Sequence, residues 1–136
     1  MPAPLEVYRR FQQDLVTGDF ARLPEVVDVA GYTEKCEGLT DWTTGLQIAL
    51  ANFQRNVLSA FSDLRGTEET VVEGADTVVI RTSYEATHTG TFLGIAPTER
   101  KIAFEAVDML RVAEGRIVWR YFLMDLYGIE QQLRRA

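Results

Sequence analysis

Hydrophobic residues along this chain follow two different periods, one before residue 62 and another after it. Up to that point they recur every three or four positions, which is the spacing of one face of an α-helix. Beyond it they alternate with polar residues, which is the spacing of a half-buried β-strand. Helices first and antiparallel strands afterwards are typical of an α+β fold, and residues 1–136 are predicted to form one domain.

The helical half of the pattern predicts three elements. The first helix covers residues 5–16 and a shorter second helix covers residues 20–29, before an extended segment at 32–36. A long third helix follows, with Thr43 or Thr44 as its N-cap and an apolar stripe that reaches Phe61. The remaining predicted elements are strands at 64–72, 77–89, 101–112 and 116–123 and a short closing helix at 126–133.

One acidic residue interrupts an otherwise apolar strand face. Strict alternation places Ile102, Phe104, Ala106, Asp108, Leu110 and Val112 on one face of their strand. A carboxylate on such a face must find hydrogen-bond donors, keep its proton or contact water in a cavity. Asp108 is therefore the first candidate for a functional acid, and the preceding strand turns Tyr84 and His88 to the same interior.

Composition narrows the possible partners. The chain is 46% hydrophobic and 25% charged, as ordinary globular proteins are. Its 20 acidic and 14 basic residues give a net charge of −6, and a protein that binds nucleic acid needs the opposite excess. No nucleic acid partner is expected.

Cys36 is the single cysteine and His88 the single histidine. One cysteine cannot form an intrachain disulfide, and the two residues cannot build a Cys/His metal site. We therefore expect no metal and no cofactor. Neither a signal-peptide pattern nor a stretch of about 18 apolar residues is present, so we expect a cytoplasmic protein without a membrane partner.

Two segments resemble a known family. Residues 86–98 read A-T-H-T-G-T-F-L-G-I-A-P-T and resemble the A-T-H-x-G-x-F-x-G-I-x-P-T segment of SnoaL-like polyketide cyclases. Residues 107–111 (V-D-M-L-R) and 115–118 (G-R-I-V) are similar to a strand pair shared with the ketosteroid isomerases. The resemblance implies an α+β fold in which a cone-shaped, curved antiparallel sheet wraps three N-terminal helices, with a short C-terminal helix. It also implies a homodimer through the outer sheet face.

The isomerase resemblance assigns roles to several acids. Asp108 matches the acid that stays protonated and donates to a developing enolate oxygen. The isomerase base lies on the first strand, where Glu34 is the nearest match and Glu37 or Asp41 are alternatives.

Other family positions hold different residues. The isomerase tyrosine of the first helix corresponds to Phe11, with Tyr8 one turn earlier as a substitute. The acid that closes the cyclase ring corresponds to Phe122, which cannot move a proton, and Asp125 follows three residues later. Relatives of limonene epoxide hydrolase carry an arginine between two inward acids, and the sequence alone does not locate such a set.

Two functions follow as hypotheses. The first is a cofactor-free cyclase or isomerase that transfers a proton next to a carbonyl of a polyketide-like or apolar substrate, with Asp108 as acid and Glu34 or His88 as base. His88 could equally hold the loop at residues 90–94 by hydrogen bonding. The second, which Phe122 favours, is a non-catalytic binding protein for a small apolar ligand. A scaffold without a pocket is a third option. The expected ligand-binding residues are Tyr84, Phe104, Phe122, Asn56 and Tyr8.

Overall fold

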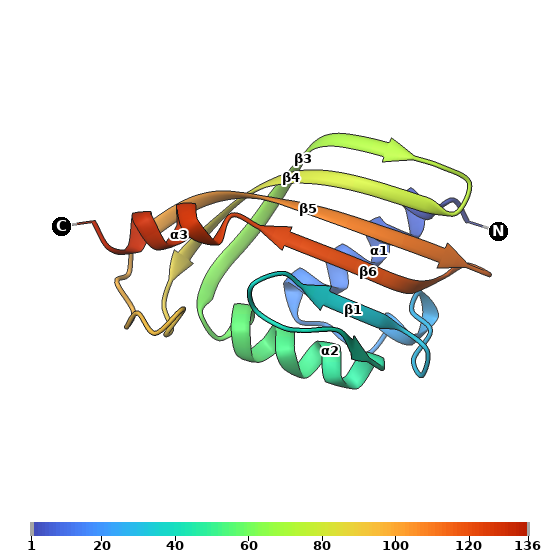
Figure 1. Ribbon diagram of the computed structural model, residues 1–136, viewed down its shortest axis with the longest axis horizontal. Coiled ribbons are helices and arrows are strands. Elements are labelled where there is room, and N and C mark those ends of the chain that lie inside the picture. The colour runs from blue at the N-terminus through green and yellow to red at the C-terminus, as the bar shows by residue number, and fades with distance from the viewer. Residues whose placement is uncertain (1, 136) are drawn as a thin grey trace.

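The long alternating segments form a six-stranded curved sheet with the order β2-β1-β6-β5-β4-β3 (Figure 1). The structure is a computed structural model that describes residues 2–135. The strands are β1 (Thr33–Cys36), β2 (Thr43–Thr44), β3 (Phe61–Glu73), β4 (Thr77–His88), β5 (Lys101–Ala113) and β6 (Arg116–Met124). The helices are α1 (Pro4–Thr17), α2 (Leu46–Phe53) and α3 (Leu126–Leu133), with a 3₁₀ turn η1 (Leu23–Glu25) and a π-helical turn η2 (Gln54–Leu58).

Helix α1 covers the inner face of the sheet, where it contacts β3, β4, β5 and β6 (Figure 1). Its apolar stripe is buried there and consists of Val7, Tyr8, Phe11 and Leu15. The helix ends at Gly18, whose φ of 76° is in the left-handed region that glycine adopts without strain. Among residues 2–135, no helix combines the length and the apolar character that crossing a membrane requires.

The period-two alternation correctly predicted which residues of β4 and β5 face the helices. The buried residues of β4 are Val78, Ile80, Thr82, Tyr84, Ala86 and His88, and those of β5 are Ile102, Phe104, Ala106, Asp108, Leu110 and Val112. The α+β class and the curved sheet are confirmed.

Two predicted helical features are wrong. Residues 20–29 form only the turn η1, because Pro24 disfavours helix at the residue before it and Val27 pairs in parallel with Ile117. Thr43 and Thr44 do not cap the long helix but form β2, as β-branched residues favour. Helix α2 therefore begins at Leu46.

The long third helix is also shorter than its apolar stripe predicted. It continues beyond α2 only through η2, and Phe61 already belongs to β3. The sheet is mixed rather than wholly antiparallel, since β1 pairs in parallel with β6. That pairing places Glu34 directly beside Arg120.

Candidate functional site

Three charged side chains meet at the inner face of the sheet. Glu34 on β1, Asp108 on β5 and Arg120 on β6 are 5%, 2% and 3% exposed. Ionisable residues are rarely buried this completely unless they are paired. Below, the three residues are called the Arg120 cluster.

A β-bulge directs Arg120 inward. Val112 of β5 lies opposite Ile117 and Arg111 lies opposite Trp119, so Val118 is an extra residue in β6. Uninterrupted alternation from the buried Ile117 would turn Arg120 outward. The extra residue reverses the faces, and sequence reasoning missed Arg120 for this reason. Two signals of the bulge were present in the sequence. They are the turn at Gly115 and the odd number of positions between Ile117 and Phe122, the inward position of the cyclase acid.

Hydrogen bonds tie the cluster together. Arg120 Nε donates to Asp108 Oδ1 over 2.6 Å, and Arg120 Nη1 donates to Glu34 Oε1 over 2.8 Å. Tyr32 Oη donates to the same Glu34 oxygen over 2.6 Å. The guanidinium also lies over the rings of Phe122 and Phe11, with its carbon 4.6 Å and 5.3 Å from their centroids. Arginine carries five N–H donors, so this geometry leaves donors for a ligand.

The electrostatics of the cluster favour one retained proton. Two ionised carboxylates around one guanidinium would leave a net buried charge of −1. Burial raises the pKa of Asp108, and the neighbouring Arg120 only partly offsets this effect. Burial disfavours the charge on Arg120, but Asp108 and Glu34 outweigh it and raise the pKa of the guanidinium. Asp108 therefore gives up its proton less readily in the folded protein than an aspartic acid in water does.

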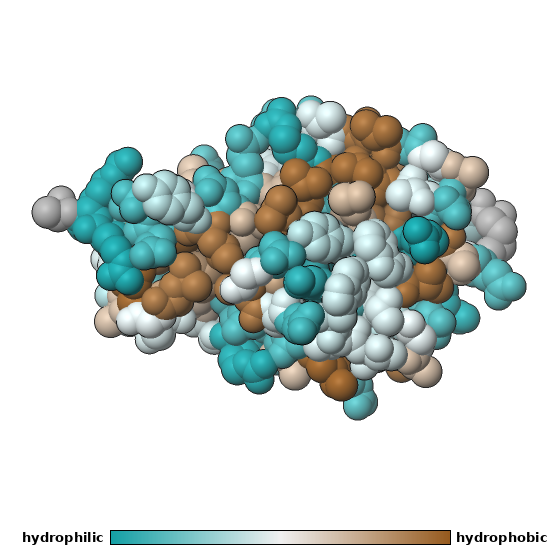
Figure 2. Space-filling view, viewed as in Figure 1, coloured by the Kyte–Doolittle hydropathy of each residue, from teal (hydrophilic) through white to brown (hydrophobic). Residues whose placement is uncertain are grey.

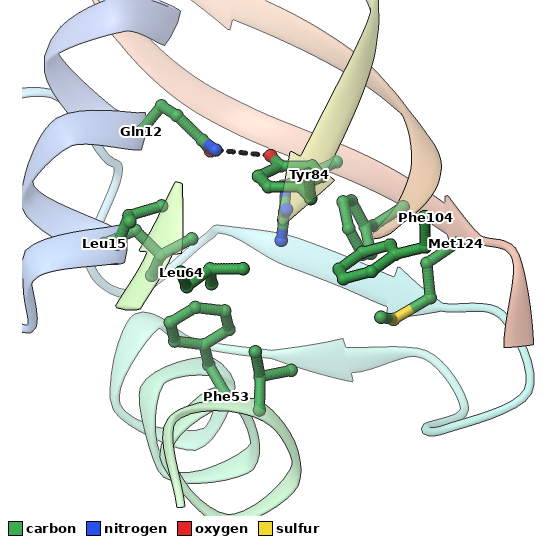
Figure 3. A pocket seen from close by; sticks show the side chains of 11 residues that line it. Gln12, Leu15, Phe53, Leu64, Tyr84, Phe104 and Met124 are labelled. Carbon is green, nitrogen blue, oxygen red and sulfur yellow. Dashed lines mark hydrogen bonds between the residues drawn. The ribbon is translucent and has the colours of Figure 1, made fainter. Parts of the chain in front are cut away.

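A narrow apolar slot lies against Arg120 (Figure 3). Its lining comes from α1, α2, η2 and strands β3 to β6, and Figure 3 labels Gln12, Leu15, Phe53, Leu64, Tyr84, Phe104 and Met124. Arg120 is the charged residue in this lining, while Glu34 and Asp108 do not line the slot. The slot has a volume of about 20 Å³, which is room for one water molecule. Typical ligand pockets have roughly 300 Å³ or more.

A second chamber of the same size adjoins the slot. It is lined by Cys36, Asn56 and neighbouring residues, and its volume is about 20 Å³. The two chambers share Phe53, Phe122 and Arg120 in their linings. Phe53 also packs against both hydrophobic clusters of the core. The Phe53 ring therefore lies where the two chambers adjoin.

The structure places the predicted ligand-binding residues around these spaces. Tyr84 and Phe104 stack with centroids 5.3 Å apart and line the slot, as Phe122 also does. Gln12 donates to Tyr84 Oη over 2.5 Å, and burial raises the pKa of Tyr84 to about 12. Asn56 lines the second chamber, whereas Tyr8 lines a groove between α1 and β3.

His88 is not brought to the cluster. Ile80 pairs with Asp108, and His88 follows eight residues further along β4, on the order of 25 Å away. Its Nδ1 accepts a hydrogen bond from the Thr98 backbone N–H over 3.1 Å. His88 and Asp108 therefore cannot act on one substrate atom, and His88 holds the loop between β4 and β5.

The same loop explains the family-like segment at residues 86–98. A Cβ atom on Gly90 would lie 1.8 Å from the carbonyl oxygen of Ser59, so only glycine fits there. The Phe92 ring packs on Phe61 with centroids 4.8 Å apart. The family-like residues of this segment therefore fix the conformation of the loop between β4 and β5.

The alternative acids lie elsewhere. Glu37 is partly exposed and accepts a hydrogen bond from Tyr121, which lowers the pKa of its carboxyl group. Asp41 is exposed, and Asp125 caps α3 by accepting from the Gly128 N–H. Of the three acids predicted as the possible base, Glu34, Glu37 and Asp41, Glu34 alone reaches the cluster. Among the described residues, no group of three His, Cys, Asp or Glu side chains could hold a metal ion.

Sequence comparison places the chain in a family. The profile of the SnoaL-like polyketide cyclases matches residues 5–133, nearly the whole chain. The chain belongs to the SnoaL-like polyketide cyclase family. No curated protein matches it at the significance required.

Several solved structures share the fold. The SnoaL-like protein of Jannaschia sp. CCS1 is 19% identical with a TM-score of 0.86, over 98% of this chain and 92% of that one. TsrD of Streptomyces laurentii is 22% identical with a TM-score of 0.80, over 97% and 95% of the two chains. IdmH of Streptomyces antibioticus, provisionally named a polyketide cyclase, is 25% identical with a TM-score of 0.81, over 96% and 97%.

Proposed function

We propose that this SnoaL-like protein is a cofactor-free acid–base catalyst acting next to a carbonyl group of a neutral, polyketide-like or otherwise apolar compound. The observation that carries the proposal is the buried Arg120 cluster beside an apolar slot. Such clusters cost free energy to bury, and strongly perturbed groups beside a cavity are typical of active sites. An anionic substrate would be disfavoured, because the carboxyl groups already balance or exceed the charge of Arg120.

In the proposed chemistry Arg120 contacts the substrate oxygen. A carboxylate removes a proton from the carbon next to the carbonyl, and the electron pair of the C–H bond moves to form an enolate. The negative charge develops on the oxygen that Arg120 holds. Glu34 is the proposed base and Asp108 the proposed acid. Since neither lines the slot, one water molecule carries the proton between the carboxyl group and the substrate.

The enolate can react in two ways, and in each of them the removed proton is replaced. Return of the proton to a different carbon gives an isomerase. Attack of the enolate carbon on a second carbonyl of the same molecule, followed by protonation of the resulting alkoxide, gives a ring and therefore a cyclase. The provisional name of IdmH supports the second outcome.

Ligand entry requires the slot to enlarge. Phe53 lies where the two chambers adjoin, immediately before the π-helical turn η2. Such turns interrupt the regular hydrogen bonds of a helix and are frequent at functional sites. Rotation of the Phe53 ring would join the two chambers into one cavity against Arg120.

A binding protein without catalysis is the second candidate. Phe122 occupies the position of the cyclase acid and lines both chambers, and the lining contains no carboxylate among residues 2–135. The same spaces would then hold an apolar ligand without turning it over.

Solvent exchange at a ketone tests the first candidate. The probe is the ketone 2-tetralone, dissolved in D₂O. When its enolate forms, deuterium replaces the α-protons and their signals disappear from the proton NMR spectrum. We expect the wild-type protein to accelerate this loss and Asp108→Asn to reduce the acceleration by roughly a hundredfold, as expected for the loss of a positioned general acid.

Glu105→Gln is the matched control, since Glu105 is an exposed carboxylate on the same strand. It should exchange protons like the wild type. If Asp108→Asn folds and keeps the full rate, the acid role fails. If the wild-type protein binds 2-tetralone without exchange, the binding function is favoured.

We also propose a homodimer through the outer face of the sheet. Figure 2 looks onto this face, where hydrophobic side chains are exposed. Trp42 packs against Trp119 and Tyr121 with tilted rings, and Met109 and Leu123 are 36% and 45% exposed beside them. Leu123→Glu places a charge in this interface and should convert the dimer to a monomer, as measured by analytical ultracentrifugation. A wild-type monomer at micromolar concentration would refute this arrangement.

A further inference from the structure

A groove between α1 and β3 contains two buried hydroxyl groups that the proposed chemistry does not use. Tyr8 and Thr82 are 1% and 4% exposed, and both line the groove. Within residues 2–135, neither Tyr8 Oη nor Thr82 Oγ1 has a hydrogen-bond partner. A buried polar group without a partner costs about 1–3 kcal/mol. Both oxygens lie just inside the groove wall with almost no accessible surface, so a ligand oxygen that enters this wall would supply the missing partner.

The groove is much larger than the slot and shares part of its lining. Its volume is about 270 Å³, against about 20 Å³ for the slot. Gln12, Val16 and Leu64 line both spaces, and Figure 3 shows Gln12 and Leu64 at the slot. One ligand could therefore extend from the groove along these side chains toward Arg120.

Gly66 of β3 leaves its own part of the groove wall without a side chain, next to Thr82. A Cβ atom at this position would lie 2.7 Å from Thr82 Cγ2 and 2.8 Å from Tyr84 Cε1. Any larger residue would press on the side chain that carries one of the two unpartnered hydroxyl groups.

The charges around the groove favour an uncharged ligand. Arg65 and Glu68 line it, but Arg65 pairs with Glu85 at 3.1 Å and Glu68 pairs with Arg9 at 2.9 Å. Burial, and secondarily the charge of Asp108, raise the pKa of Tyr8, so its phenol remains a neutral donor. The remaining polar residues of the lining carry hydroxyl and amide groups.

We propose that this groove is a binding subsite for an uncharged hydroxyl or carbonyl oxygen of the ligand, recognised by Tyr8 and Thr82. The apolar remainder of the ligand lies along Val16 and Leu64. The subsite extends the proposed function by adding a polar anchor to an apolar substrate, but binding there requires no turnover.

A matched pair of probes tests the subsite. Titration of the full chain at pH 7 with 2-naphthol and with naphthalene, followed by the fluorescence of each probe, gives two dissociation constants. We expect the wild-type protein to bind 2-naphthol more tightly. Tyr8→Phe or Thr82→Val should weaken 2-naphthol by about 3- to 10-fold and leave naphthalene unchanged, which is the effect of one hydrogen bond.

Several results would overturn the subsite. They are equal affinity of the wild-type protein for both probes, binding of neither, or an unchanged preference in the Tyr8→Phe/Thr82→Val double variant. A drop of several degrees in the Tm of unliganded Tyr8→Phe would also do so, because it would show that the hydroxyl already has a partner.

Asp108→Asn separates this inference from the proposed function. It should abolish most of the proton exchange and retain the preference for 2-naphthol. Unchanged exchange in Asp108→Asn, together with lost preference in the double variant, would refute the catalytic role and leave the subsite intact.

Discussion

The inner face of the sheet buries a charged cluster at one place and a histidine at another, and each place offsets the cost of burial differently. Around Arg120, charges of opposite sign compensate one another through hydrogen bonds of 2.6 Å and 2.8 Å. Around His88, which is fully buried, one ring nitrogen accepts from the Thr98 backbone. Only the Arg120 cluster adjoins the slot.

This difference separates a candidate catalytic site, the Arg120 cluster, from a structural residue, His88. Both His88 and Asp108 are buried, inward-facing and matched by family-like sequence. Burial alone therefore does not identify a catalytic residue. What distinguishes the Arg120 cluster is an ionisable group with spare donors at the wall of a cavity, whereas His88 is used in shaping a loop.

The largest expected effect concerns the charge compensation of the Arg120 cluster. Arg120→Met leaves Asp108 and Glu34 buried without a counterion, and should lower the free energy of unfolding by about 3–5 kcal/mol. Urea denaturation followed by circular dichroism measures this change. Adding Asp108→Asn and Glu34→Gln to the variant should recover much of the loss, and a loss below about 1 kcal/mol for Arg120→Met alone would contradict the pairing.

A smaller effect on stability is expected around His88. His88→Phe keeps a ring but removes the acceptor of the Thr98 N–H, which should cost about 1–3 kcal/mol. Hydrogen exchange should become faster at the Thr98 and Glu99 amides. The α-proton exchange of 2-tetralone should be unchanged, and a large loss of exchange in a folded His88→Phe protein would return His88 to the catalytic candidates.

The smallest effect is a pH dependence that arises from Asp108 in the Arg120 cluster. The folded state raises the pKa of Asp108 above its usual 3.8, mainly through burial. The folded protein therefore holds this proton more tightly than the unfolded chain. The resulting stability is present below pH 3.8 and is lost as the pH rises through the raised pKa.

Asp108→Asn removes this titration. The free energy of unfolding of the variant, relative to that of the wild type, should therefore increase as the pH rises above 3.8, by at most about 1.4 kcal/mol for each unit of pKa change. Glu37, whose pKa is lowered, acts in the opposite direction but contributes equally to both proteins. A pH-independent difference would show that Asp108 ionises normally.

Much of the fold was predictable because local patterns decide it. Alternation correctly assigned the inner faces of β4 and β5, including Asp108 in its apolar surroundings. The stripe of α1 likewise predicted the buried face of that helix. The prediction of a second helix at residues 20–29 was wrong, because Pro24 and the pairing of Val27 with Ile117 of β6 override a weak helical period.

The candidate site was only partly predictable. The acid Asp108 and the candidate base Glu34 could be named from the sequence, but not the arginine that joins them. Glu34 and Arg120 are 86 positions apart and meet through parallel pairing of β1 with β6. No local pattern specifies that pairing.

The sequence by itself determined the α+β class, the family and the inward position of Asp108, since side-chain direction within a regular strand depends only on the strand's own period. Tertiary structure alone decided that Arg120 faces inward, that it lies between two acids and that His88 is remote from them. The reason is that a bulge at Val118 reverses the faces of β6, and that reversal is fixed by pairing with β5 rather than by the residues of β6.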